Sequence, residues 1–124
     1  MAAQALLDYE SLTDLELAGY FAAKDARAVR LVTARNNQRL FRTAWSILKN
    51  RSEAEDVVQE TYLRALGAIG RFEGRSSLST WLTRIAINEA LTRKRAQQRR
   101  ANAFNEKSVL VMEEYREKLL GSPE

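Results

Sequence analysis

Cysteine and histidine are both absent from the 124 residues of the chain. Their absence excludes disulfide bonds, thiolate nucleophiles, zinc sites of the Cys/His type and any mechanism that uses a histidine base. The chain contains only one proline and five glycines. This scarcity, together with abundant alanine, leucine, arginine and glutamate, favours an all-α fold. The length suits one domain with a modest core.

Apolar runs long enough to span a bilayer are also lacking. The N-terminus, MAAQALLDYESL, carries acidic residues where a secretory signal would carry lysine or arginine. We therefore expect a cytoplasmic protein without membrane contact. The adjacent carboxylates Glu55 and Asp56 lie on a predicted exposed helix face without a partner base. We expect no catalysis, no cofactor, no bound metal and no small-molecule substrate.

The net charge of +4 is concentrated in one stretch of the chain. Residues 1–70 contain nine basic and nine acidic side chains, whereas residues 71–100 contain eight basic and two acidic ones. Residues 101–124 contain three basic and five acidic side chains. Such a localised positive charge is typical of a surface that binds a polyanion, and a solvated helix end is the alternative.

Hydrophobic spacing predicts a compact bundle of three long helices plus a short N-terminal one. The short helix begins near Thr13, which has capping-box spacing to Glu16, and ends near Ala23. It is expected to bury some combination of Leu15, Ala18, Tyr20 and Phe21.

The first long helix is predicted over residues 26–49, and Asn36-Asn37 interrupts its periodicity. Its core-facing stripe consists of Val29, Val32, Leu40, Phe41, Ala44, Trp45 and Leu48. The second long helix is predicted to begin at a capping box formed by Ser52 and Glu55 and to end near Ile69. Its apolar face consists of Ala54, Val57, Val58, Tyr62, Ala65, Leu66 and Ile69.

The third long helix is predicted over residues 78–101. Its core-facing residues are Leu78, Trp81, Leu82, Ile85 and Ala86. The run RKRAQQRR has no apolar face, so this half must project into solvent or onto a partner. In the mixed tail, residues 102–124, VLVMEEYREKLL is compatible with a short amphipathic helix.

The loop RFEGRSS lies between two predicted helices and combines an aromatic ring, arginines, serines and a glycine. This combination suits melted DNA, because unpaired bases stack on aromatic rings and guanidinium groups hold phosphates. A small loop with Gly74 and serines can form a cup for an extruded base. Phe72 and Trp81 are alternatively core residues. For Trp81 we prefer a position at the core edge, supporting the loop from beneath.

The run AEDVVQETYLRALGAIGRFEGRSSLSTWLTRIAINEALTRKR, from Ala54 to Arg95, resembles region 2 of the sigma-70 family in its extracytoplasmic-function branch. The preceding QRLFRTAWSILKN resembles region 2.1 of the same family. The likeness covers about residues 12–100, and a pattern of this length in fixed order is far more specific than a short motif. It implies a region 2 domain over residues 1–101 that acts in transcription initiation.

The resemblance implies that the helix of residues 54–69 docks on the clamp helices of the largest subunit of core RNA polymerase. The implied contact residues are Asp56, Gln59, Glu60 and Arg64. A merely solvated helix face is the alternative. An anti-sigma factor that covers the clamp-facing helix, the DNA surface or both is a further implied partner.

The resemblance also implies that the loop of residues 72–77 takes a flipped base from the non-template strand of the promoter −10 element, which the factor thereby recognises and melts. The implied DNA contacts are Arg71, Phe72, Arg75, Ser76, Ser77, Arg84, Asn88, Arg93, Lys94 and Arg95. Four residues recur near the helical period and share one side of their helix, namely Trp81, Arg84, Asn88 and Arg95. Asn88 offers a donor and an acceptor to a base edge, and a helix-to-helix hydrogen bond is its alternative.

A complete member of the family carries a second helical domain, region 4, which reads the −35 element, and nothing after Arg100 resembles it. Either the sequence is a fragment in which residues 102–124 begin the interdomain linker, or the protein lacks that domain. Two other classes stay open. They are a generic helical nucleic-acid-binding module without polymerase binding, and a helical protein-interaction domain whose basic helix is solvated.

Overall fold

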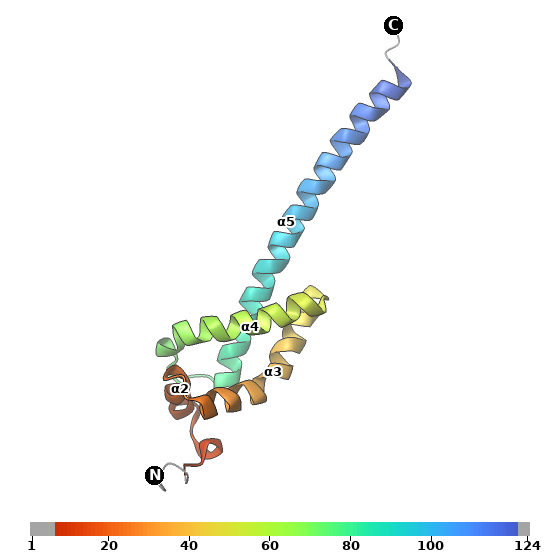
Figure 1. The fold of residues 1–124 in the computed structure, drawn as a ribbon. Coiled ribbons are helices and arrows are strands. Elements are labelled where there is room, and N and C mark those ends of the chain that lie inside the picture. The colour runs from red at the N-terminus through yellow and green to blue at the C-terminus, as the bar shows by residue number, and fades with distance from the viewer. Residues whose placement is uncertain (1–6, 122–124) are drawn as a thin grey trace. The chain divides into compact units, whose positions relative to one another are not determined.

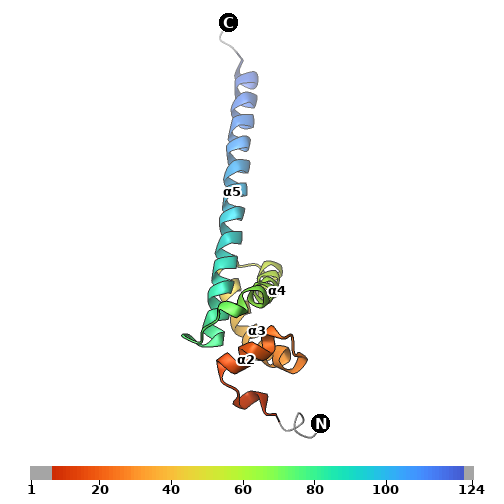
Figure 2. The ribbon, with the colours of Figure 1, turned by 90° about the vertical axis from the view of Figure 1, so that its left-hand side faces the viewer.

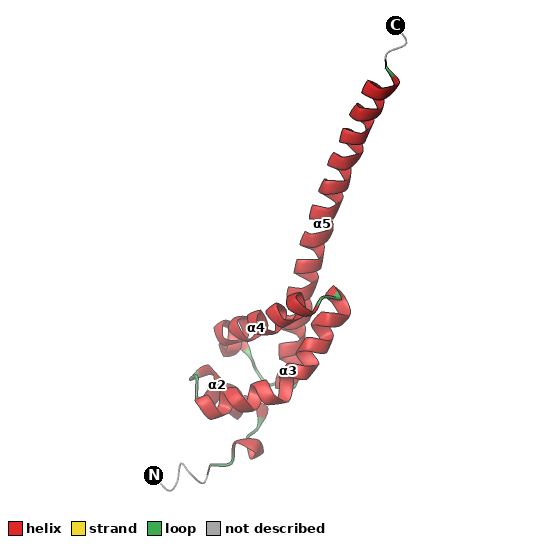
Figure 3. Cartoon of the chain, turned by 45° about the vertical axis from the view of Figure 1, so that its right-hand side comes forward, coloured by secondary structure: helices red, strands yellow, loops and turns green. Residues whose placement is uncertain are grey.

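Helices make up all the regular structure in the computed structural model, which describes residues 7–121 (Figure 3). The elements are η1 (Tyr9–Ser11), α2 (Asp14–Ala22), α3 (Ala26–Leu48), α4 (Arg51–Ala68), η2 (Ile69–Arg71) and α5 (Leu78–Leu120). The predicted all-α fold is confirmed. The chain divides into two compact units, Met1–Leu91 and Thr92–Glu124. In the described part, no helix has the length and apolar character needed to cross a membrane.

The capping box predicted at the start of α2 is present. The Thr13 hydroxyl accepts a hydrogen bond from the Glu16 amide, and the Glu16 carboxylate accepts one from the Thr13 amide. The hydrogen bond from the Thr13 amide to the carboxylate holds the pKa of Glu16 below its usual value. Of the four candidates for burial, Ala18 and Phe21 are buried, whereas Leu15 and Tyr20 are exposed. The buried residues of α2 are Leu17, Ala18 and Phe21.

The start of α3 is held by Asp25, whose Oδ1 accepts hydrogen bonds from the amides of Arg27 and Ala28 at 3.0 and 3.1 Å. Its Oδ2 accepts one from the Tyr9 hydroxyl at 2.9 Å, which ties η1 to α3. The amide of Ala28 and the hydroxyl of Tyr9 keep the pKa of the Asp25 carboxyl below its usual range. Asp25 thus caps α3 and anchors the N-terminal segment onto it.

Asn36-Asn37 interrupts the hydrophobic periodicity but not the helix, and α3 is continuous through both residues, as predicted for residues 26–49. Asn36 is buried and donates a hydrogen bond from Nδ2 to the Val32 carbonyl at 2.8 Å. The amide side chain therefore bonds back onto its own helix and does not break it.

The start of α4 differs from the prediction. Asn50 is the N-cap, and its side-chain oxygen accepts a hydrogen bond from the Glu53 amide at 2.9 Å. Ser52 lies inside the first turn, so the predicted capping box between Ser52 and Glu55 is wrong. Asn50 stands three residues before Glu53, as Ser52 stands three residues before Glu55, and it caps the helix two residues earlier than predicted. The helix buries Thr61, whose hydroxyl donates to the Val57 carbonyl at 2.6 Å.

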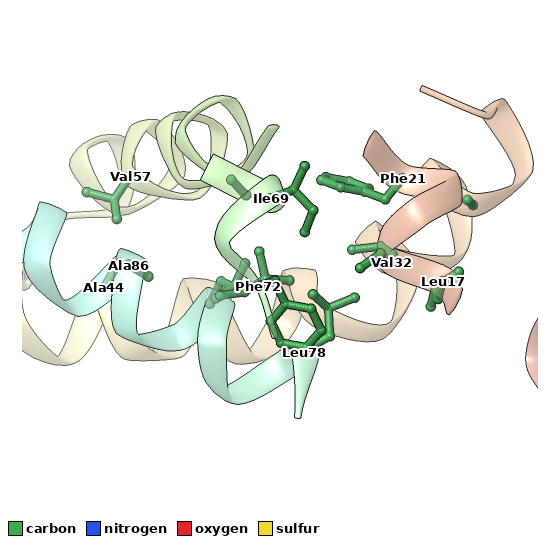
Figure 4. Close-up of a cluster of buried hydrophobic side chains, with 14 of the residues drawn as sticks. Leu17, Phe21, Val32, Ala44, Val57, Ile69, Phe72, Leu78 and Ala86 are labelled. Carbon is green, nitrogen blue, oxygen red and sulfur yellow. The ribbon is translucent and has the colours of Figure 1, made fainter. Parts of the chain in front are cut away.

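The chain reverses between α3 and α4, and α4 returns alongside α3 (Figures 1 and 2). The Tyr62 hydroxyl of α4 donates to the Asn37 side chain of α3 at 2.6 Å. Burial raises the pKa of Tyr62 to about 12. Buried side chains from α2, α3, α4, η2 and the first part of α5 meet in one cluster (Figure 4).

The third long helix, predicted over residues 78–101, does not end near Ala101, because α5 continues to Leu120. Its first part buries Leu78, Leu82, Ala86 and Ala90 at every fourth position, and Trp81 and Ile85 pack at the edge of the core. None of residues 92–121 is buried. The amphipathic helix considered for residues 109–120 is thus part of α5. Residues 1–6, used in the argument against a secretory signal, and residues 122–124 lie outside the described residues.

Candidate nucleic-acid interface

The loop of residues 72–77 leads into α5 and is held at its C-terminal end by hydrogen bonds. Gly74 has φ +76°, a conformation that side chains with a Cβ rarely adopt. Ser77 caps α5, since its Oγ accepts a hydrogen bond from the Thr80 amide at 3.0 Å. The Asp14 carboxylate accepts a second one from the Leu78 amide at 2.8 Å. The loop is therefore held in one shape.

A pocket of about 290 Å³ opens beside this loop. Its lining residues are Arg71, Phe72, Glu73, Arg75, Ser76, Trp81 and Arg84. This volume lies at the lower end of the roughly 300–1,000 Å³ of drug-sized ligand sites. Such a space suits one flat ring system better than a large ligand.

Aromatic rings form one wall of the pocket. Phe72 is only 7% exposed and belongs to the core cluster. Its ring lies 5.5 Å from that of Trp81, at an interplanar angle of 59°. Phe72 is thus mainly a core residue, as the alternative interpretation held. The interpretation of its ring as an open platform for base stacking is wrong. Trp81 lies at the core edge beneath the loop, as expected.

Three arginines surround the pocket with one carboxylate. Arg75 forms an exposed ion pair with Glu73 at 3.3 Å. Arg71 and Arg84 are exposed and form no ion pair within residues 7–121. The rim therefore carries net positive charge, part of which is available to a phosphate. Glu73 was missed as a lining residue because a single acid in a basic loop has no distinctive pattern.

The structure brings together only some of the residues predicted to contact DNA. Arg71, Phe72, Arg75, Ser76 and Arg84 line one pocket. The hydroxyl of Ser77 caps α5 and does not line it. Asn88 is exposed one helical turn after Arg84, on the same side of α5. The basic cluster of Arg93, Lys94 and Arg95 belongs to the second unit.

The predicted polymerase-binding face lies on α4. Asp56 and Gln59 are exposed, and Glu60 is partly buried. Arg64 pairs with Glu60 at 3.3 Å and with Glu89 of α5 at 2.9 Å. Arg64 therefore links α4 to α5. The sequence reasoning missed Leu63, which is 64% exposed on this face; its only sequence sign was its place off the apolar stripe.

The support of the loop by α2 was also missed. Asp14 resembles an ordinary first-turn acid of its own helix, and its hydrogen-bond partner, Leu78, is 64 residues away. No local pattern connects the two. In the described residues, no group of three or more acidic side chains is arranged to hold a metal ion.

Comparison with known proteins gives the family. The model of sigma-70 region 2 matches residues 32–100, more than half of the chain. The RNA polymerase sigma-H factor of Pseudomonas aeruginosa is 38% identical over 66 residues, which are 53% of this chain and 34% of that protein. The ECF RNA polymerase sigma-E factor of Haemophilus influenzae is 35% identical over 91 residues, which are 73% of this chain and 48% of that protein. The chain spans a third to a half of the length of these relatives.

A solved structure has the same fold. It is the NMR structure of an engineered region 2 of sigmaE in complex with GTAAAA, which is 33% identical and has a TM-score of 0.62. The match covers 73% of this chain and 95% of that one. Members of the family are transcription initiation factors, which confirms the expectation that the chain is not an enzyme. The chain belongs to the sigma-70 family, as a region 2 domain of its extracytoplasmic-function branch.

Proposed function

We propose that this domain recognises the promoter −10 element, captures one flipped base of the non-template strand, and binds core RNA polymerase through α4. The observation that carries the proposal is the loop pocket, with its aromatic wall and its rim of Arg71, Arg75 and Arg84. A pocket of this size accepts a single base, and the guanidinium groups hold the phosphates on either side of it.

Base capture needs a preformed cup, because unstacking a base costs a few kcal/mol. The loop meets this requirement, since Gly74, Ser77 and Asp14 hold its backbone without nucleic acid. Trp81 and Phe72 support the pocket from the core side. The engineered sigmaE region 2 binds the sequence GTAAAA, and the same type of ligand suits this pocket.

The strand is proposed to continue from the pocket along α5. Arg84 and Asn88 share one exposed side of this helix. Arg84 holds a phosphate and Asn88 contacts a base edge. Arg93, Lys94 and Arg95 add phosphate contacts of lower specificity.

Polymerase binding is assigned to the exposed face of α4, through Asp56, Gln59 and Glu60. Leu63, which is exposed beside these residues, is proposed to add an apolar contact to this acidic face. Arg64 supports the face by its ion pair to Glu89. The partner surface is the clamp helices of the largest subunit.

Two further parts of the proposal come from the family. Residues 1–101 form the region 2 domain, and residues 102–124 begin a linker, which is helical as far as Leu120. An anti-sigma factor that covers the α4 face or the loop pocket would keep the domain from polymerase or DNA.

Oligonucleotide binding tests the pocket. We expect Arg84→Ala to weaken binding of single-stranded GTAAAA about tenfold, since a hydrogen bond to a charged group contributes about 1.5–3 kcal/mol. The slope of log K against log salt should fall by about 0.7, the value for one lost phosphate contact on a single strand. Fluorescence anisotropy at several salt concentrations measures both. Arg51→Ala removes an equally exposed charge outside the pocket and should leave binding unchanged.

Retention on core RNA polymerase tests the second part. Gln59→Ala combined with Leu63→Ala should reduce retention without changing oligonucleotide binding. Oligonucleotide binding without any retention of the unaltered chain would favour the generic nucleic-acid-binding module. Equal oligonucleotide binding by the Arg84→Ala and unaltered chains would contradict base capture in this pocket.

A further inference from the structure

The exposed face of α3 carries a second basic surface, separate from the loop pocket. α3 contains five arginines and no acidic residue. This charge is not visible in the neutral total of residues 1–70, because the balancing acids lie on other elements such as α4. The net charge of a whole segment therefore conceals a strongly basic helix.

Four residues of this helix and its C-cap form a continuous strip, the α3 stripe, which consists of Arg39, Arg42, Trp45 and Lys49. They follow one another at intervals of three and four residues, and all four are exposed. Such spacing puts side chains on one face of a helix. With a rise of 1.5 Å per residue, the stripe is about 15 Å long.

Trp45 is the unusual member of the stripe. Its hydrophobic spacing predicts a core position, yet it is 45% exposed, while the neighbouring Ala44 is fully buried. Its ring is contacted by the ammonium group of Lys49, which lies 4.6 Å from the ring centroid. A large aromatic ring at the surface beside cations is typical of a binding surface.

Lys49 holds a backbone conformation that is costly for its residue type. It ends α3 with φ 54° and ψ 32°, in the left-handed region where glycine or asparagine is usual. A lysine in this position places a cation over Trp45 that glycine would not supply. Strained backbone of this kind clusters at functional sites, and here it accompanies the contact between Lys49 and the exposed indole.

The cations of the stripe are available to a ligand. Within residues 7–121, Arg39, Arg42 and Lys49 form no ion pair. Their positive charge is therefore not neutralised by the protein, and the surface is complementary to a polyanion.

We propose that the α3 stripe binds single-stranded nucleic acid, with Arg39, Arg42 and Lys49 holding phosphates and Trp45 stacking on an unpaired base. Cations alone would serve an acidic protein equally well, but an exposed indole between them suits a strand whose bases are free. This inference rests on the proposed function, because the nucleotides bound here are proposed to belong to the strand whose flipped base the loop pocket holds.

Binding at the α3 stripe and binding at the loop pocket can be distinguished with two single strands of different length. One is the hexanucleotide GTAAAA, and the other extends it with thymidines to about 15 nucleotides, near the upper end of the roughly 4–16 that one OB-fold domain contacts. Fluorescence anisotropy with the whole chain measures both affinities. We expect Arg42→Ala combined with Trp45→Ala to weaken binding of the longer strand at least tenfold and to change binding of the hexanucleotide less than twofold.

Three variants serve as controls. Trp45→Tyr retains a stacking ring and should bind the longer strand within about threefold of the unaltered chain. Arg30→Ala removes an exposed charge from a different face of the same helix and should change neither affinity. Arg42→Glu reverses the charge while Trp45 is retained, and should weaken only the longer strand.

The outcomes distinguish the two proposals. If the α3 variants bind the longer strand normally while Arg84→Ala weakens both strands, the α3 inference is wrong and the pocket proposal stands. If the α3 variants lose retention on core polymerase but keep the longer strand, the stripe contacts protein and the inference is again wrong. If the unaltered chain binds neither strand, both proposals fall.

Discussion

The two parts of α5 belong to one helix but have opposite environments. In residues 78–91, Leu78, Leu82, Ala86 and Ala90 are buried at every fourth position. In residues 92–120 no side chain is buried. The large apolar residues exposed there are Phe104, Val109, Leu110, Val111, Met112, Tyr115, Leu119 and Leu120.

This difference shows that two separate physical causes produce the same backbone conformation. The first part is helical because packing against the other helices stabilises it, as for most helices in globular proteins. The second part is helical through its many alanine, glutamate, lysine, arginine and leucine residues, which have high helix propensity. We therefore expect the second part to open locally and independently of the first.

Truncating one leucine in each part should give the largest contrast. Leu82 is fully buried and Leu110 is 61% exposed. Leu82→Ala should lower the free energy of unfolding by about 2–5 kcal/mol, because it leaves a cavity in the core. Leu110→Ala should change it by less than about 0.5 kcal/mol. Urea unfolding measures both, and similar losses would show that the second part is packed.

Alkaline pH should destabilise the packed unit through Tyr62. Burial raises its pKa to about 12 from 10.0, so the stabilisation from its neutral form is complete below pH 10.0 and is lost as the pH rises toward 12. The urea midpoint should therefore fall across this window. In Tyr62→Phe the fall of the midpoint should be smaller, whereas Tyr115→Phe, a change in the exposed part, should show the same fall as the unaltered chain. If the fall is unchanged in Tyr62→Phe, groups other than Tyr62 cause the alkaline destabilisation.

Glycine substitutions should give the smallest effects and sharpen the contrast. Ala101→Gly disfavours an exposed helix by about 1 kcal/mol. It should reduce the helical signal in far-UV circular dichroism without moving the urea midpoint. Ala86→Gly, at a fully buried position, should lower the free energy of unfolding by at least about 1 kcal/mol and should therefore lower the urea midpoint. A shifted midpoint for Ala101→Gly would show that the two parts unfold together.

The boundaries of the helices were predicted to different accuracy for identifiable reasons. The starts of α2 and α3 follow from Thr13 and Asp25, and the predicted starts are correct or within one residue. At α4, Asn50 and Ser52 both satisfy the pattern of a cap, and only the backbone shows which amide is bonded. The end of α5 was predicted too early because the tail after residue 101 has a mixed pattern, whereas its high helix propensity alone extends the helix to Leu120.

The candidate site was only partly predictable. The loop and its arginines follow from charge and the family pattern, and five of the predicted DNA contacts line one pocket. The burial of Phe72 does not follow, because an aromatic residue in a loop is equally compatible with a core anchor or a stacking platform. For Trp45 the error was the opposite one. Its spacing relative to Leu40 and Ala44 predicts a core position, whereas the packing leaves it exposed.

The sequence by itself determined the helical class, the approximate helices, the absence of Cys/His chemistry and the basic stretch around the loop. These properties depend on composition and on neighbours within a few residues. Only the tertiary structure decided that Asp14 holds the start of α5, that Arg64 pairs with Glu89, and that α3 presents a basic face with an exposed Trp45. Periodicity shows which residues share a face of a helix, but the partner of that face is set by packing between segments far apart in the chain.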